Sequence, residues 1–135
     1  MYMYGFFGGI VMNKKIEKYL NQNKSSSFSE ILFNFIDKKG LTDTEVYKKV
    51  SIDRRLFSKI RCNTNYIPKK ENIIKLSLAL SLKRCELDEL LYSAGYTLST
   101  NNNFDLVISF CIENNIYDID IVNDYLYTFT NTVLA

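Results

Sequence analysis

The fold of this chain is most clearly predicted by residues 41–61, LTDTEVYKKVSIDRRLFSKIR. Thr42 and Glu45 form a capping-box pattern, which predicts the start of a short helix. Asp53 is a suitable N-cap for a second helix over residues 54–61. A turn of about three residues separates the two helices, and apolar side chains recur at helical spacing on both sides of it. Two helices joined in this way are expected to cross steeply and to bury a shared seam.

The rest of the chain also predicts helices joined by short polar loops. Capping, proline and glycine signals mark boundaries at Ser27, Gly40, Pro68 and Gly95. We expect further helices over residues 13–22, 28–39, 69–81, 86–93, 104–113 and about 118–127. The Asp caps favour a helix at the end of the chain, although its Tyr- and Ile-rich composition also resembles a strand. The range 69–81 has so little polar surface that we expect it at the centre of the core.

The composition fits one compact helical domain. The 135 residues are 47% hydrophobic and 24% charged, which allows a real core and excludes a disordered tail. One proline and five glycines argue against a turn-rich all-β fold. No apolar run approaches the ~20 residues that span a bilayer, so we predict no membrane association.

The side chains used in most catalytic and metal sites are scarce. Histidine is absent, and the three cysteines, Cys62, Cys85 and Cys111, are widely spaced. The sequence also lacks a glycine-rich phosphate loop and a G-x-S-x-G motif. We therefore predict no metal, no cofactor and no enzymatic activity. Reduced cysteines fit a cytoplasmic location, with Cys111 in the core and Cys62 exposed.

Charge is distributed unevenly along the chain. Residues 42–84 contain eleven Lys and Arg and four Asp and Glu. Residues 85–135 contain eight Asp and Glu and no Lys or Arg. This asymmetry indicates two surfaces with different partners, although an unevenly charged solvated surface is the simpler interpretation.

The first eleven residues raise a separate hypothesis. The stretch from Gly8 to Met12 back-translates to a purine-rich sequence shortly before a start codon, which resembles a ribosome-binding site. The native protein would then start at Met12, and residues 1–11 would not be part of it. Mass spectrometry of the native N-terminus tests this, because a peptide containing Phe6 and Phe7 would contradict it.

Polar residues on the second helix of the 41–61 stretch suggest a partner. A helix fits the major groove of duplex DNA, where side chains of its first turn reach base edges. Arginine suits this role because its planar fork donates two hydrogen bonds to guanine. The residues predicted to read bases are Arg54, Arg55, Ser58 and Lys59. Those predicted to contact phosphates, which fix register, are Lys48, Lys49, Arg61, Asn63, Asn65, Lys69 and Lys70.

At these residues the chain resembles a known family. Residues 40–96 are similar to the XRE-type, Cro and λ-repressor-like helix-turn-helix domain in three places: GLTDTEVYKKVSIDRRLFSKIR, the loop that ends in Pro68, and IIKLSLALSLKRCELDELL. The resemblance covers under half of the chain. It implies a five-helix domain, major-groove binding by residues 53–61 and dimerisation on a palindromic operator. Three positions depart from the family pattern: Tyr47 replaces a small alanine, Ser51 replaces a glycine, and Arg61 replaces a glutamate.

The resemblance leads to our main prediction of fold and function. We expect an all-α protein with an N-terminal segment (1–26), a five-helix helix-turn-helix domain (27–96) and a C-terminal helical extension (97–135). The N-terminal segment would add one helix. The function expected is sequence-specific binding of double-stranded DNA, as a transcriptional regulator of a bacterium, phage or mobile element. An ordinary solvated helix face is the alternative interpretation of the basic residues.

A second hypothesis is a phage-type inhibitor that binds a host or immune protein such as a CRISPR effector. The acidic residues 85–135 would then mimic nucleic acid toward a basic groove. A partner or dimer surface is predicted at Tyr117, Tyr125, Tyr127 and Phe129, although such a stripe is more often part of a core.

Overall fold

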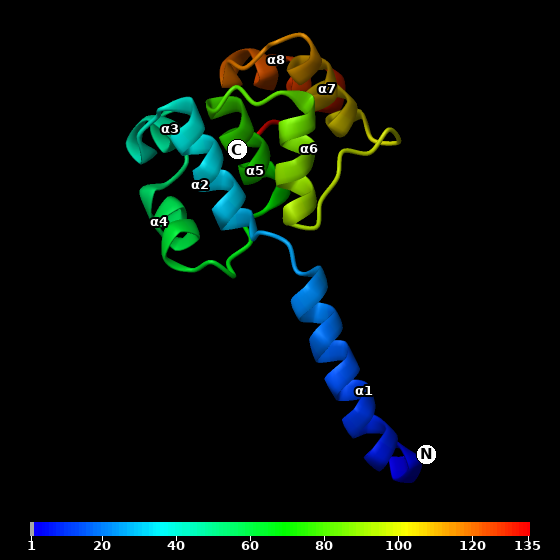
Figure 1. Ribbon diagram of the computed structural model, residues 1–135. Coiled ribbons are helices and arrows are strands. Elements are labelled where there is room, and N and C mark those ends of the chain that lie inside the picture. Colours follow the sequence, from blue (N-terminus) through cyan, green and yellow to red (C-terminus); the bar gives the residue numbers. More distant parts are fainter. Residues whose placement is uncertain (1) are drawn as a thin grey trace.

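The computed structural model describes the backbone of residues 2–135 and the side chains from Val11 onward. Every regular element in this part of the chain is a helix, which confirms the predicted all-α class. The helices are α1 (Tyr2–Asn23), α2 (Phe28–Lys39), α3 (Asp43–Lys49), α4 (Arg54–Cys62), α5 (Lys70–Ala79), α6 (Arg84–Ser93), α7 (Asn103–Glu113) and α8 (Ile119–Thr130) (Figure 1). Phe6 and Phe7, on which the start-site hypothesis depends, lie outside the described side chains, so that hypothesis stays a prediction.

Helix α5 lies at the centre of the fold, as its composition predicts. Seven of its ten residues are buried, and it packs against α3 and α6 (Figure 1). One cluster of buried side chains continues from Phe28 in α2 to Leu134 near the end of the chain. Helices α7 and α8 pack on each other and, through α6, on the rest of the fold. The C-terminal helices therefore share a core with α2–α6.

Five helices end in the same backbone conformation. One or two positions after the last helical residue, each has a residue with a positive φ: Gly40, Ser51, Ser81, Gly95 and Asn115. The N–H of the next residue then donates to the carbonyl five positions back, as Ile52 N does to Tyr47 O at 2.9 Å. This Schellman motif satisfies carbonyls at the helix end and turns the following apolar residue toward the core.

Two serines occupy this left-handed position without the freedom of glycine. Ser51 has a φ of 55° between α3 and α4, and Ser81 has a φ of 50° after α5. A non-glycine residue in this conformation places its Cβ close to a backbone oxygen, which costs roughly 1–2 kcal/mol. Ser51 thus takes a conformation that glycine adopts most readily.

Replacing Ser51 with glycine is expected to raise the free energy of unfolding by about 0.5–1 kcal/mol. The strain at Cβ is relieved, and the greater freedom of glycine in the unfolded chain offsets part of the gain. Urea unfolding followed by circular dichroism measures the change. Ser58→Gly is the matched control, because Ser58 lies inside α4 and glycine there should destabilise. An unchanged or lower stability of Ser51→Gly would contradict the strain.

Most predicted helix boundaries are confirmed within one residue, whereas α8 continues to Thr130, three residues beyond its predicted end. Two boundaries that differ by two residues have a local cause. Helix α5 ends at Ala79 rather than at 81, because Ser81 takes the left-handed conformation. Helix α6 begins at Arg84 rather than at 86, because the N–H of Lys83 donates to Glu86 Oε1 at 2.9 Å and caps an earlier turn. The last segment is a helix, as predicted, and not a strand.

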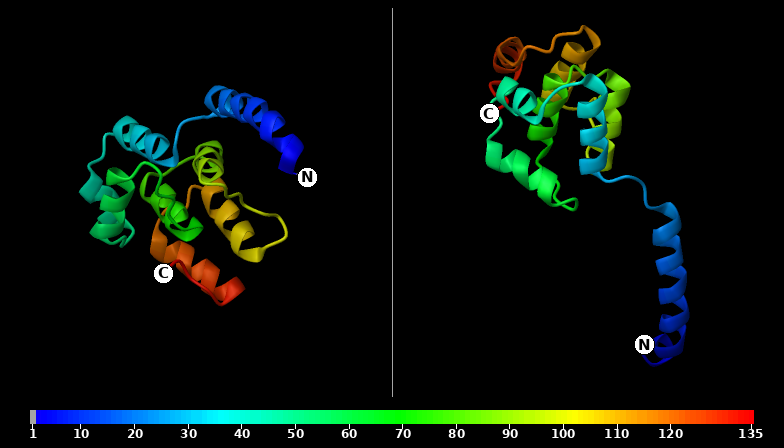
Figure 2. Two further views of the ribbon diagram at one scale, coloured as in Figure 1. Left: turned by 90° about the horizontal axis from the view of Figure 1, so that it is seen from below. Right: turned by 60° about the vertical axis from the view of Figure 1, so that its left-hand side comes forward.

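Helix α1 stands away from the rest of the molecule (Figures 1 and 2). It is longer than the predicted 13–22, and every residue from 11 to 26 is exposed. Only the short segment 24–27 joins it to α2. The exposed residues include Ile16, Tyr19 and Leu20, which were expected on one face. None of the helices searched in the described part is long and apolar enough to cross a membrane.

Candidate nucleic-acid interface

Helix α4 is held on the body of the protein by one face. Asp53 caps its first turn by accepting a hydrogen bond from Arg55 N at 2.7 Å. Phe57 and Ile60 are buried beneath the helix. Because side chains at i and i+4 share a helix face, Arg54 lies next to Ser58 and Arg55 next to Lys59 on the side of the helix away from Phe57 and Ile60. These are the four predicted base-reading residues. All four are exposed.

The turn before α4 fixes its direction. Ile52 is buried, and its N–H binds Tyr47 O while Ser51 N donates to Lys48 O at 3.3 Å. Tyr47, which replaces the small alanine of the family pattern, is half-buried. Its ring packs on Phe57 with 5.6 Å between centroids and 45° between planes. The bulky side chain therefore fills the junction of α3 and α4 and does not point into solvent.

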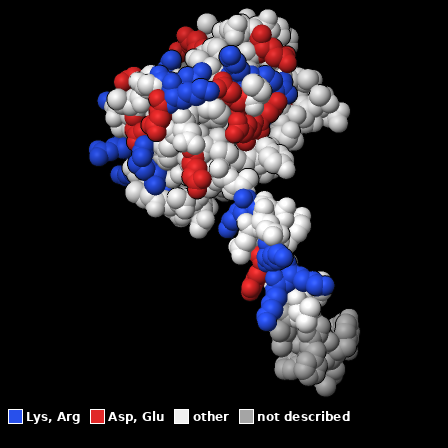
Figure 3. Space-filling view, viewed as in Figure 1, with Lys and Arg blue, Asp and Glu red and all other residues white. Residues whose placement is uncertain are grey.

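Basic side chains surround the outer face of α4. Figure 3 shows Lys and Arg over the α3 and α4 side of the molecule, with acidic side chains among them. Lys48 and Lys49 are exposed at the end of α3, and Lys69 is exposed just before α5. Among the described side chains, ion pairs form elsewhere and involve neither these lysines nor Arg54 and Arg55. Lys59 lies over the ring of Tyr66, with its ammonium 5.7 Å from the centroid.

Arg61 has a structural role in place of the predicted phosphate contact. Its Nε and Nη2 donate to the two carboxylate oxygens of Asp43 at 2.7 and 2.8 Å. Its guanidinium also lies 3.9 Å from the centroid of the Phe33 ring. This bidentate pair ties the last turn of α4 to the first turn of α3, so we leave Arg61 out of the proposed interface.

Lys70 is likewise engaged inside the protein. Its ammonium donates to both carboxylate oxygens of Asp105 at 2.8 and 2.9 Å. Asp105 is buried and also accepts from Ser99 N at 2.8 Å. The pair joins α5 to α7, so Lys70 is not available to a phosphate. Sequence reasoning missed this partner because Asp105 lies in an apolar helix far along the chain.

Asn63 and Asn65 lie in the loop after α4, next to the basic face. Both are exposed. The side-chain oxygen of Asn63 accepts from Asn65 N at 3.0 Å, which stabilises the turn. The amide of Asn65 has no such partner among the hydrogen bonds of the described residues. Asn63 thus shapes the loop, while Asn65 remains open to a ligand.

The predicted aromatic surface of the C-terminal helices divides into two parts. Tyr117 is half-buried, and its hydroxyl donates to Leu82 O at 3.0 Å, so it belongs to the packing between the end of α7 and α5. Tyr125, Tyr127 and Phe129 are exposed. Phe110 of α7 is also exposed, which the residue pattern did not predict because α7 is apolar around most of its surface.

Burial and a neighbouring carboxylate act together on Tyr117. Burial raises the pKa of its hydroxyl, and the negative charge of Glu86 raises it further. Between the ordinary pKa of about 10 and the raised value, the unfolded chain loses this proton and the folded chain keeps it. The free energy of unfolding therefore falls as the pH rises through this window.

Tyr117→Phe is expected to lower the free energy of unfolding near neutral pH by about 1 kcal/mol, since Leu82 O loses its donor. In the alkaline window the difference between the two proteins should shrink, because the variant has no phenol to ionise. Urea unfolding at a series of pH values measures both effects. Tyr127→Phe, at an exposed position, is the control. A constant difference at all pH values would contradict the assigned pKa.

Half of the eight carboxylates in residues 85–135 are paired with basic residues of the preceding segment. The carboxylates of Glu86, Asp88, Asp105 and Glu113 each lie within 4.0 Å of a Lys or Arg side chain. Arg84 contacts two of them, Asp88 on its own helix and Glu113 on α7. The charge asymmetry of the sequence is thus partly neutralised by folding. Cys62 is exposed and Cys111 is buried, as predicted.

Comparison with protein-family models, curated proteins and solved structures finds no match for this chain. Function is therefore inferred from the residues themselves. Two surface regions are not accounted for by the ion pairs and hydrogen bonds described above. One is the exposed face of α4 with its flanking lysines, and the other is the apolar surface of α7 and α8.

Proposed function

We propose that this chain is a sequence-specific double-stranded DNA-binding protein that acts as a transcriptional regulator, with α3 and α4 as its helix-turn-helix. The observation that supports this most is the outer face of α4. It presents Arg54, Arg55, Ser58 and Lys59 together, on a helix fixed from below by Phe57 and Ile60. Arginine and lysine heads exposed on a rigid helix suit the donor and acceptor pattern of the major groove.

The flanking lysines complete the proposed interface. Lys48 and Lys49 at the end of α3 and Lys69 before α5 would contact phosphates on either side of the groove. Asn65 would add an uncharged contact. These contacts set position and general affinity, and the α4 residues set sequence preference. The resemblance of residues 40–96 to the λ-repressor-like domain supports the same assignment.

Selection from random DNA duplexes with the full-length protein tests this function. We expect one enriched sequence motif, and a binding constant that falls with salt at a slope of about −0.9 per phosphate neutralised. Three lysines per chain correspond to a slope near −2.7 before any arginine contributes. A matched selection with single-stranded DNA should give no enriched motif. If duplex selection enriches nothing and binding has no salt dependence, the proposal is wrong.

The inhibitor hypothesis is our second candidate, and the exposed apolar surface of α7 and α8 is what favours it. The nucleic-acid mimicry that we expected from residues 85–135 has less support, because four of the eight carboxylates have basic partners within the chain. Affinity purification of the tagged protein from its native host separates the two candidates. One stoichiometric protein partner with no retained DNA would favour the inhibitor.

A further inference from the structure

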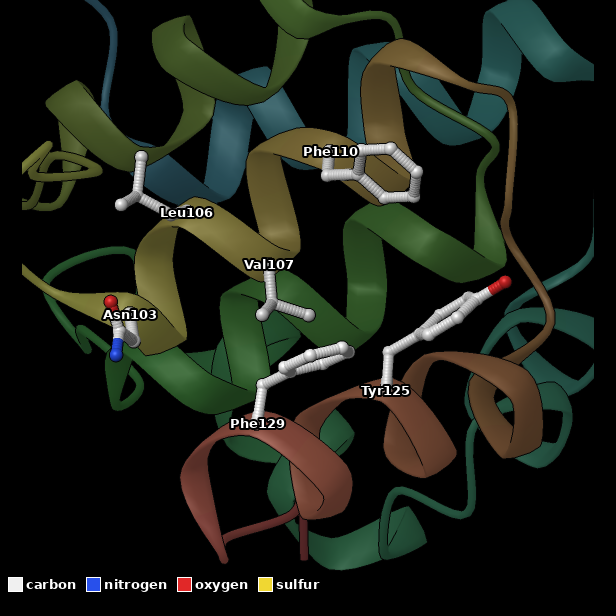
Figure 4. A pocket seen from close by; sticks show the side chains of 6 residues that line it. All are labelled: Asn103, Leu106, Val107, Phe110, Tyr125 and Phe129. Carbon is white, nitrogen blue, oxygen red and sulfur yellow. The ribbon is translucent and has the colours of Figure 1, made fainter.

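An apolar groove lies between α7 and α8 (Figure 4). It has a volume of about 490 Å³. Its lining residues are Asn103, Leu106, Val107, Phe110, Tyr125 and Phe129, from both helices. Phe110 and Tyr125 meet edge to face across it, with 6.2 Å between ring centroids and 81° between planes. Large apolar side chains that stay exposed in a concave surface are typical of a site for another chain.

The surroundings of this groove are acidic. The exposed carboxylates nearest to it are Asp124, beside the lining residue Tyr125 on α8, and Glu113 on α7. Asp124 forms no ion pair among the described side chains, whereas Glu113 lies 3.5 Å from Arg84. Residues 85–135 themselves contain no Lys or Arg. A basic amphipathic helix is therefore the complementary ligand, because its apolar side chains fill the groove and its lysines meet the carboxylates.

Helix α1 has this chemistry. Met12, Ile16, Tyr19 and Leu20 follow helical spacing on one face, and each is more than half exposed. The same region has Lys14, Lys15, Lys18 and Lys24 and only one acidic residue. Figure 3 shows these basic side chains around the helix. The described part of the chain buries none of these four side chains, and an exposed apolar stripe of this kind suits contact with a partner.

The dimensions of the two surfaces agree. From Met12 to Leu20 the stripe on α1 spans about 12 Å at 1.5 Å per residue. From Asn103 to Phe110 the groove side of α7 spans about 10 Å by the same rise. One stripe can therefore occupy the groove along its length, with the lysines on the solvent side.

The helix lies away from the groove of its own chain. In Figure 1 and in the right-hand view of Figure 2, α1 extends from one end of the molecule and the α7–α8 pair lies at the other. The linker 24–27 has only four residues, so bringing α1 to that groove would require a large rearrangement of the chain. We therefore take the helix that fits the groove from a second molecule.

We propose that two copies of this chain bind each other through α1, each helix occupying the α7–α8 groove of the other copy. The exchange is reciprocal, so it closes as a symmetric dimer. The inference does not rest on DNA binding, since no residue of the α4 face takes part in it.

The test is the mass of the full-length protein in solution over a concentration series, measured by sedimentation. The wild-type protein should be a dimer. Phe110→Asp removes an aromatic anchor from the groove, and Leu20→Asp places a charge in the α1 stripe. Each should raise the dimer dissociation constant by at least about 30-fold, as expected for loss of a central anchor. Tyr127→Asp is the matched control, because Tyr127 is exposed on α8 but does not line the groove.

Mixing the two variants distinguishes this arrangement from the others. Phe110→Asp retains an intact α1, and Leu20→Asp retains an intact groove, so the mixture should form a one-to-one complex while each variant alone is monomeric. Circular dichroism checks that both variants remain folded. A dimeric Phe110→Asp would show that α1 binds another α1, and a dimeric Leu20→Asp would show that groove binds groove. Either result, a monomeric wild type, or a mixture that stays monomeric overturns the proposal.

Discussion

Replacing Lys70 with methionine is expected to lower the free energy of unfolding by about 3 kcal/mol. The variant leaves the buried carboxylate of Asp105 without its ammonium partner, although Ser99 N still donates to it. Removing one member of a buried ion pair typically costs about 3–5 kcal/mol. We expect the lower end of this range, because the Lys70 side chain is 26% exposed and water can approach it. Urea unfolding measures the change.

Two further variants separate the ion pair from a general effect of substitution. Lys69→Met, one residue earlier and exposed, should change the stability by no more than about 0.5 kcal/mol. Lys70→Met combined with Asp105→Asn should recover part of the loss, because no charge then remains buried. If Lys70→Met costs less than about 1 kcal/mol, the pair is screened by solvent and the account of the α5–α7 junction is wrong.

Replacing Arg54 and Arg55 together with alanine is expected to abolish most sequence preference. Each bidentate contact to a base contributes about 1–3 kcal/mol, so the double variant should bind the selected duplex at least about 30-fold more weakly. Both side chains are exposed and lack ion pairs within the described residues, so the free energy of unfolding should stay within about 0.5 kcal/mol of wild type. Fluorescence anisotropy with the selected duplex and with a scrambled duplex measures the loss.

The matched control removes the same charge from elsewhere. Lys24→Ala with Lys38→Ala deletes two exposed positive charges outside α3 and α4. It should weaken binding to both duplexes slightly and equally, because only long-range attraction is lost. If the two double variants behave alike, α4 does not read bases and the proposed orientation is wrong.

Local signals were sufficient to predict most of the helices. The caps at Thr42 and Asp53 and the glycines at 40 and 95 each act within a few residues, so the sequence states them directly. Ser81 takes the same left-handed conformation as those glycines without any residue-type signal, and the end of α5 was predicted two residues late for that reason.

The charged partners of the predicted site were less accessible to prediction. Arg61 meets Asp43 across eighteen residues, and Lys70 meets Asp105 across thirty-five. Such pairs depend on how helices pack, which a pattern along the chain does not contain. The groove between α7 and α8 was missed for the same reason. A helix that is apolar on every side gives no indication of which side faces solvent, and only packing against α8 leaves Phe110 exposed.

The shared helix-end geometry also restricts where this chain can change length. At the five helix ends with this geometry, the left-handed residue is followed at once by an apolar side chain that lies in or against the core, as at Ile52 and Leu82. One added residue at such a joint would rotate the next side chain away from its place and misdirect the following helix. The loop at 63–68 has no left-handed residue at either end, and the loop at 97–102 has one only before it, at Gly95. Insertions or deletions, whether inherited or engineered, are therefore best tolerated in those two loops.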